Sequence, residues 1–230
     1  MADGPGHRRA TPPPLIAVAG LGKRYGRHVA LADLSLMLRE GEIVGFVGAN
    51  GSGKTTALRL LAGLLRPDEG GGVVLGFDLR RGAAEIRAQV GYMAQRLSLY
   101  AELSVIENLR FRAEVYGLAD ACAVAEATAT AFDLTRHRSS RAGALSGGWA
   151  RRLQLAAALV HAPRVVLLDE PTSGLDAAAR DDLWRRIGAL AAGGAGVVVS
   201  THDSAETARC SRLAAFADGR VAPRAAATAL

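Results

Sequence analysis

Two separate glycine-containing segments of this chain have the composition of phosphate-binding devices. The first, residues 48–55, reads GANGSGKT and matches the pattern G-x-x-x-x-G-K-[ST]. Its glycines allow consecutive backbone amides to point at the α and β phosphates of a nucleotide, and the dipole of a following helix adds positive potential. We expect Lys54 to reach the β and γ phosphates and the Thr55 hydroxyl to ligate magnesium.

Two acidic residues follow an aliphatic run, VVLLDE, at residues 165–170. The run predicts a buried strand, and a strand beside the loop strand would bring Asp169 to the magnesium and Glu170 near the γ phosphate, where it can polarise a water. Two surface carboxylates after a core strand are a common alternative. The glycine loop upstream favours phosphate chemistry.

The second glycine segment is LSGG at residues 145–148, directly before a predicted helix over 149–160. Ser146, Gly147 and Gly148 would form a second amide nest at a helix N-terminus, suited to a γ phosphate. The alternative is an ordinary loop with the serine as helix N-cap. One nucleotide needs only one such cradle, so two real cradles that cannot reach the same nucleotide imply a partner chain.

The elements that must position these residues follow from hydrophobic periodicity. Predicted strands are 15–20, 32–38, 43–47, 90–94, 165–168 and 196–200, a glycine-broken β-like stretch is 70–79, and predicted helices are 55–65, 149–160 and 178–190. Helical spacing with fewer β-branched residues predicts a helical insertion over about 96–160. Short, fully apolar strands alternating with helices imply an α/β fold with a parallel sheet covered on both faces.

Length and composition limit the class of protein. A chain of 230 residues fits one domain, predicted over 15–222, with flexible tails at 1–14 and 223–230. No window has the roughly 18–20 consecutive apolar residues of a membrane span, and no export signal is evident, which predicts the cytoplasm. The net charge is +6, but the basic residues are scattered without interleaved aromatics, so we expect no nucleic-acid partner.

With these motifs in place, the sequence closely resembles the nucleotide-binding domain of ABC transporters over residues 15–222. Residues 48–56 resemble the Walker A motif, Gln95 the Q-loop glutamine, 145–148 the signature, 165–170 Walker B, 171–176 (PTSGLD) the D-loop and 201–203 (THD) the H-loop. The resemblance implies a P-loop NTPase core with a mainly parallel sheet, an antiparallel β subdomain and a helical subdomain.

The resemblance also implies a site composed from two chains. Two such domains meet head to tail and sandwich two ATP molecules, each between the Walker A motif of one chain and the signature of the other. The residues expected to contact ATP are Tyr25, Gly48, Ala49, Asn50, Gly51, Ser52, Gly53, Lys54, Thr55, Thr56 and Gln95 of one chain and Ser146, Gly147 and Gly148 of the other.

The resemblance also implies roles for individual residues within that site. Thr55, Gln95 and Asp169 would ligate Mg²⁺, Glu170 would be the catalytic base, and His202 would contact the γ phosphate and position the base and the water. Tyr25 resembles the aromatic residue that stacks on adenine, the alternative being an exposed loop tyrosine.

Two positions depart from the family pattern. Trp149 stands where the family usually has glutamine, which puts a polar contact of the signature in doubt, and Ala94 precedes Gln95 where proline is frequent. A tryptophan at this place is also similar to some drug-exporter ATPases.

The leading functional hypothesis is the ATP-hydrolysing subunit of an ABC transporter, peripheral on the inner face of the cell membrane, with an integral membrane permease subunit and a second ATPase chain as partners. The second chain could be identical or different. Export is favoured over import, and the transported substrate is not encoded in this chain. The alternatives are a non-transport ABC ATPase acting on a ribosome or DNA complex, and a degenerate subunit that only binds nucleotide.

Overall fold

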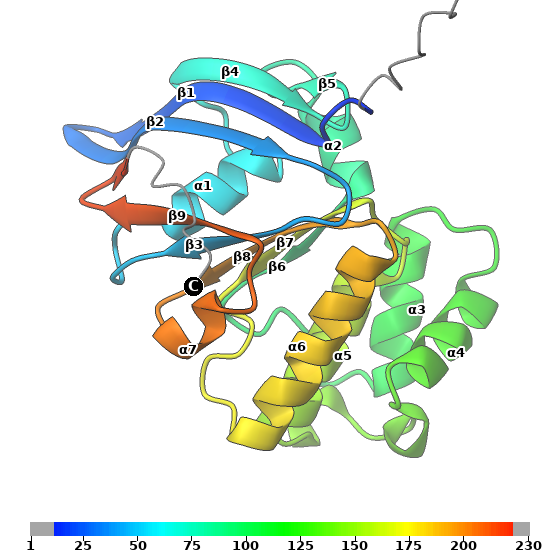
Figure 1. The fold of residues 1–230 in the computed structure, drawn as a ribbon. Helices are drawn as coiled ribbons and strands as arrows, with labels where there is room; N and C mark the ends of the chain where they lie inside the picture. The colour runs from blue at the N-terminus through cyan, green and yellow to red at the C-terminus, as the bar shows by residue number, and fades with distance from the viewer. Residues whose placement is uncertain (1–11, 223–230) are drawn as a thin grey trace, which may run out of the picture.

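The apolar runs of the sequence form the strands of one bent sheet in a computed structural model, which describes residues 12–222 (Figure 1). Residues 1–11 of the predicted N-terminal tail, and the predicted tail at 223–230, lie outside the described residues. The sheet has ten strands in the order β5-β4-β1-β2-β10-β9-β3-β8-β7-β6. The strands are β1 (Ile16–Tyr25), β2 (His28–Leu38), β3 (Ile43–Val47), β4 (Glu69–Val74), β5 (Phe77–Asp78), β6 (Val90–Met93), β7 (Val165–Asp169), β8 (Gly196–Thr201), β9 (Arg212–Ala217) and β10 (Arg220–Val221).

The sheet has an antiparallel part and a parallel part. Strands β5, β4, β1 and β2 pair antiparallel, whereas β9, β3, β8, β7 and β6 pair parallel, and β10 joins the two parts by pairing with β2 and β9. The central strands β3, β7 and β8 are buried almost throughout, as expected for a parallel sheet covered on both faces. The predicted α/β class with a mainly parallel core is confirmed.

Helix α1 (Lys54–Leu61) lies inside the bend of the sheet and contacts β2, β7 and β8 (Figure 1). Its Leu58, Leu60 and Leu61 are fully buried and join the cluster that links the two parts of the sheet. The helix ends four residues before the predicted end at residue 65, because Gly63 takes a left-handed conformation (φ 67°) that breaks the helical path.

The remaining helices are α2 (Ala83–Gln89), α3 (Val105–Val115), α4 (Ala121–Ala131), α5 (Gly147–Leu159), α6 (Ala177–Ala192) and α7 (Ser204–Thr207), with short 3₁₀ turns at Thr135–His137 and Ala142–Ala144. Helix α5 contacts β6 and α6 contacts β8, on the side of the parallel strands away from α1. Helices α3, α4 and α5 form a separate apolar cluster to one side of the sheet (Figure 1).

Several elements differ from the expectations. Strands β1 and β2 form a longer hairpin than the predicted 15–20 and 32–38, and α2, α7, β9 and β10 were not predicted. Among residues 12–222, no helix combines the length and apolar character needed to cross a membrane.

Candidate nucleotide-binding site

The glycine loop connects the end of β3 to the first residue of α1, as predicted. Gly48 (φ 151°) and Gly53 (φ 105°) have left-handed backbone conformations in crowded surroundings. A Cβ atom on Gly48 would lie 2.2 Å from the carbonyl oxygen of Phe216, and one on Gly53 would lie 2.6 Å from that of Ala30. Glycine is therefore required at both positions by conformation and by space.

Lys54 turns its side chain back into this loop. Its Nζ donates hydrogen bonds to the carbonyl oxygens of Gly48 (2.7 Å) and Ala49 (2.9 Å), and the residue is 4% exposed. Desolvation lowers the pKa of Lys54, whereas the negative charges of Glu170 and Asp169 oppose that shift. A buried cation at the centre of the loop gives the loop positive potential.

A cavity of about 420 Å³ opens beside the loop. It is lined by Tyr25, His28, Ala30, Asn50, Gly51, Gly53, Lys54, Thr55, Thr56, Gln95 and Glu170. Eight of the predicted ATP-contacting residues and the predicted base therefore surround one hollow. Tyr25, at the end of β1, is about half exposed (49%) and forms part of this wall.

The first carboxylate, Asp169, ends β7 and is buried. Thr55 Oγ1 donates to its Oδ1 (3.1 Å), and the fully buried Ser200 Oγ donates to the same oxygen (2.7 Å). These contacts bring a hydroxyl and a carboxylate together at the loop, as the two predicted magnesium ligands require.

The second carboxylate, Glu170, meets the other two predicted site residues. Gln95 Nε2 donates to its Oε2 (2.9 Å), and Nδ1 of His202 lies 3.4 Å from its Oε1. The side chain of His202 is about half exposed, whereas that of Glu170 is buried. The structure thus gathers the three residues from the ends of β6, β7 and β8.

The backbone of Glu170 is unusual. Its φ of 46° places a residue with a long side chain in the left-handed region, which costs on the order of 1 kcal/mol or more. Its amide donates a hydrogen bond to Ser200 Oγ (2.9 Å), which supports this conformation, and Glu170 lines the cavity.

The second predicted cradle lies at the start of α5 and does not line this cavity among the described residues. Ser146 is the N-cap residue of α5, but its side chain makes no capping hydrogen bond, and a Cβ atom on Gly147 would meet nothing within 4 Å. Ser146 and Gly147 are exposed, and the Ser146 hydroxyl is not engaged in capping its own helix. The two cradles do not form one cavity within a single chain.

Trp149 turns away into the helical cluster. The guanidinium carbons of Arg136 and Arg152 lie 4.4 and 4.3 Å from its ring centroid, and the ring of His137 lies 4.6 Å away. Cation–π attraction of this kind fixes both the tryptophan and the arginines.

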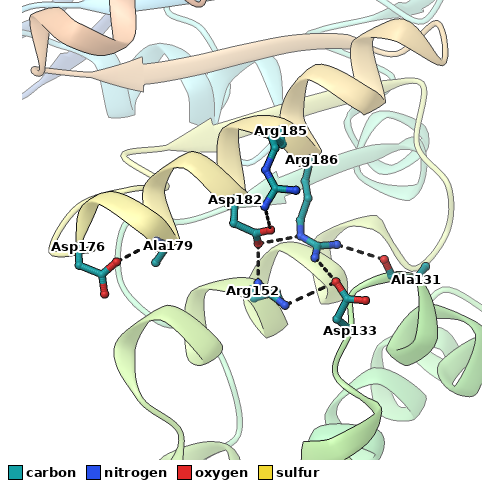
Figure 2. Close-up of polar contacts among 8 residues, drawn as sticks. All are labelled: Ala131, Asp133, Arg152, Asp176, Ala179, Asp182, Arg185 and Arg186. Carbon is teal, nitrogen blue, oxygen red and sulfur yellow. Dashed lines mark hydrogen bonds and ion pairs between the residues drawn. The ribbon is translucent and has the colours of Figure 1, made fainter.

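Arg152 also belongs to an ionic network that joins α5 to α6 (Figure 2). Its Nη2 lies 2.6 Å from Asp182 Oδ2, the same oxygen that Arg186 Nε approaches at 3.0 Å, and Arg186 also pairs with Asp133. Partial burial alone would raise the pKa of Asp182, but the hydrogen bond and charge of Arg186 and the other arginines lower it overall. Because α6 begins at its N-cap Asp176, in the predicted D-loop, the network ties that segment to the signature helix (Figure 2).

Four residues of this region were not predicted. His28 and Ala30 line the cavity. The only feature of the sequence that could have indicated them is their closeness to Tyr25. Ser200 hydrogen-bonds both Asp169 and Glu170. Its position, as a polar residue directly after the apolar run 196–199, could have indicated it. Gln154 lies in the middle of an apolar helix, where a lone amide is an anomaly.

The fold and the site together define a P-loop nucleotide-binding protein, and comparison with known proteins identifies the family. Residues 31–173 match the family described as "ABC transporter". The chain belongs to this family, as its ATP-binding domain, and the resemblance stated from the motifs is confirmed.

Curated relatives carry transporter names. The chain is 37% identical over 209 residues to the probable multidrug ABC transporter ATP-binding protein YbhF of Escherichia coli, covering 90% of this chain and 36% of that protein. It is 38% identical to the daunorubicin resistance ATP-binding protein DrrA2 of Streptomyces coeruleorubidus, covering 89% of this chain and 65% of that one. For the Nod factor export ATP-binding protein I of Cupriavidus metallidurans the identity is 37%, with 90% and 69% covered. The chain thus spans about a third to two thirds of these relatives.

Solved structures agree. An ATP-binding subunit of an ABC transporter superposes with a TM-score of 0.82 at 31% identity, covering 93% of this chain and 90% of that one. A dimeric post-hydrolysis state of the ATP-binding cassette MJ0796 bound to ADP and Pi gives 0.84 at 25% identity, covering 94% and 100%.

Proposed function

We propose that this chain binds and hydrolyses ATP and so powers export of a substrate through a separate integral membrane subunit. The observation that carries the proposal is the meeting of Gln95, Glu170 and His202 beside the loop that holds Lys54. The names of the relatives, which refer to multidrug transport, drug resistance and Nod factor export, support transport and its outward direction. None of those names supports the ribosome or DNA alternative.

The residues around the cavity fit a nucleotide triphosphate with magnesium. Lys54 and the loop amides provide a cation and donors for phosphate oxygens, and Thr55 with Asp169 provides two oxygen ligands. Within residues 12–222, no group of three or more His, Cys, Asp and Glu suited to a metal is present, so the metal would share its coordination with the nucleotide. Bound Mg²⁺ supplies charge neutralisation on the β and γ phosphate oxygens.

The chain's own groups would then act in sequence. Lys54 exchanges the loop carbonyls for phosphate oxygens, and Tyr25 stacks on the base. Glu170 accepts a proton from the attacking water, while His202 and Gln95 orient that carboxylate and contact the γ phosphate.

The open second cradle supports a partner chain. Ser146, Gly147 and Gly148 would contact the γ phosphate of the nucleotide held by a second ATPase chain, head to tail, and the partner would return the same contact. The complex would lie on the cytoplasmic face of the membrane, where the permease subunit docks.

The test compares wild-type protein with Glu170→Gln. Wild type is expected to release phosphate from ATP, whereas Glu170→Gln should bind ATP, turn it over at least about 100-fold more slowly, and form a dimer in ATP that gel filtration detects. Wild-type turnover by Glu170→Gln would show that the base is elsewhere. Copurification of a polypeptide with several apolar spans would support the transporter role, and its absence together with ribosome or DNA copurification would overturn it.

A further inference from the structure

Gln154 joins the helix of the second cradle to the loop that carries Gln95. It is 2% exposed, on the third turn of α5. Its Nε2 donates to the carbonyl oxygens of Ala94 (3.0 Å) and Arg96 (2.9 Å), the two residues that flank Gln95, and lies 3.4 Å from Ser98 Oγ. Its Oε1 accepts from Arg151 (3.0 Å). Both the donor and the acceptor group of this side-chain amide are therefore hydrogen-bonded.

The part of this loop next to Gln95 has little other hydrogen-bond support. Residues 95–98 are exposed and lie outside any helix or strand, and Gln95 itself is an exposed residue whose side chain reaches Glu170. An amide group has two hydrogens to donate, and the carbonyls on either side of Gln95 take them. A hydrocarbon side chain of the same length would leave these carbonyls without that donor, so the loop would shift or become mobile.

The helix that holds Gln154 is also the helix that begins at Ser146. A helix transmits displacement along its length because its backbone hydrogen bonds resist bending. Near its start, α5 is fixed to α6 by the Arg152–Asp182 ion pair. A movement of Gln95 therefore reaches the signature segment of the same chain through one side chain and one rigid element.

Resting on the function proposed above, we propose that Gln154 is a positioning residue that couples the nucleotide site of its own chain to the cradle offered to the partner chain. Engagement of Gln95 at one nucleotide fixes the loop, Gln154 fixes α5 to the loop, and Ser146 to Gly148 are thereby placed for the second nucleotide. The two sites of a dimer are linked in this way without direct contact between the nucleotides.

The chain offers a matched control for loss of a buried amide. Asn108 on α3 is also 2% exposed, and its Nδ2 donates to the carbonyl oxygens of Tyr100 (3.0 Å), Leu103 (3.2 Å) and Ser104 (3.0 Å). It holds the far end of the same connection between β6 and α3, at residues 100–104, and none of these carbonyls flanks Gln95. Asn108→Leu removes a comparable set of hydrogen bonds from the part of this connection that is farther from Gln95.

The experiment places Gln154→Met and, separately, Asn108→Leu in the Glu170→Gln background. ATP affinity is measured by titration at protein concentrations too low for dimers, and dimer formation by gel filtration over a range of ATP. For Gln154→Met, we expect an unchanged monomer affinity and a rise of about tenfold in the ATP needed for half-maximal dimer, within the usual range of coupling between sites. For Asn108→Leu, we expect lower thermal stability but dimer formation at the parent's ATP concentration.

A second readout uses the active enzyme. In the wild-type background, Gln154→Met should lower kcat and bring the Hill coefficient for ATP toward 1, and Gln154→Glu, which keeps the shape but replaces the donor with an acceptor, should do the same. Parent-like dimer formation by Gln154→Met, or an equal loss in Asn108→Leu, would overturn the inference. Failure of the Glu170→Gln parent itself to bind ATP or to dimerise would instead overturn the proposed function.

Discussion

The side-chain amide of Gln95 donates a hydrogen bond to the carboxylate of Glu170, across 2.9 Å and 75 residues of sequence. The proposed magnesium ligand and the proposed base are therefore in direct contact. Substitution of Gln95 should therefore change how Glu170 functions, and substitution of Glu170 should change how Gln95 functions.

Gln95→Ala is expected to reduce ATP turnover by about tenfold to a hundredfold, because the base loses a group that orients it. ATP affinity without magnesium should change little, whereas the magnesium concentration for half-maximal activity should rise. Phosphate release measured over a range of Mg²⁺ separates these effects. An unchanged magnesium dependence would remove Gln95 from the proposed ligands.

Lys54→Met is expected to weaken ATP binding by about tenfold to a hundredfold, the effect of losing charged hydrogen bonds to phosphate. Isothermal titration calorimetry measures the Kd directly. The chain contains only one other lysine, Lys23, which pairs with Asp68 and lies outside the glycine loop, so Lys23→Met is the comparison. Equal losses in the two variants would mean that general charge, not the position of Lys54, attracts the nucleotide.

Asp182→Asn is expected to lower the free energy of unfolding by about 2–3 kcal/mol, because Arg152 and Arg186 would keep only the more exposed Asp133 as a shared anion. Urea unfolding at neutral pH measures the loss. The exposed pair of Glu102 and Arg141 provides the comparison, and Glu102→Gln should cost less than about 1 kcal/mol.

The buried ring of His161 should make the stability of the fold sensitive to acid. Its ring stacks on Tyr116 at 3.7 Å, and burial lowers its pKa from 6.5 to about 4. The unfolded chain therefore binds a proton at a higher pH than the folded chain, so stability falls as the pH falls from 6.5 toward 4. The loss should be on the order of 1–3 kcal/mol after allowance for solvent screening. Unfolding curves at several pH values measure it, and His161→Phe, which keeps the stacking, should remove this part of the pH dependence.

The sequence predicted the parallel core well because the signal there is local. Strand β3 has the predicted bounds of 43–47, and the glycine loop after it follows a fixed spacing. By contrast, β9 (RLAAFA) carries few large apolar residues, and β1 is interrupted by glycines at 20 and 22, so neither has a clear pattern of alternation over its length. Pairing with strands distant in sequence, β1 with β4 and β9 with β3, determines where they run.

The site was predictable only in part. The motifs identified which residues gather at the cavity, whereas their roles in binding and hydrolysis stay predictions. The contacts that support them join distant positions: Ser200 reaches Asp169, and Gln154 reaches a carbonyl 60 residues away. Side-chain direction in the folded chain determines such contacts, and no spacing in the sequence encodes it.

At Glu170, a backbone conformation that costs stability coincides with the side chain that the proposed reaction needs. Glycine adopts a φ of 46° without strain, so Glu170→Gly should relax the backbone and yield a protein as stable as wild type, or up to about 1 kcal/mol more stable, with no hydrolysis. Thermal unfolding and a phosphate assay on the same preparation would measure both. Selection for stability alone would favour glycine at this position. The presence of Glu170 therefore indicates selection for the proposed reaction.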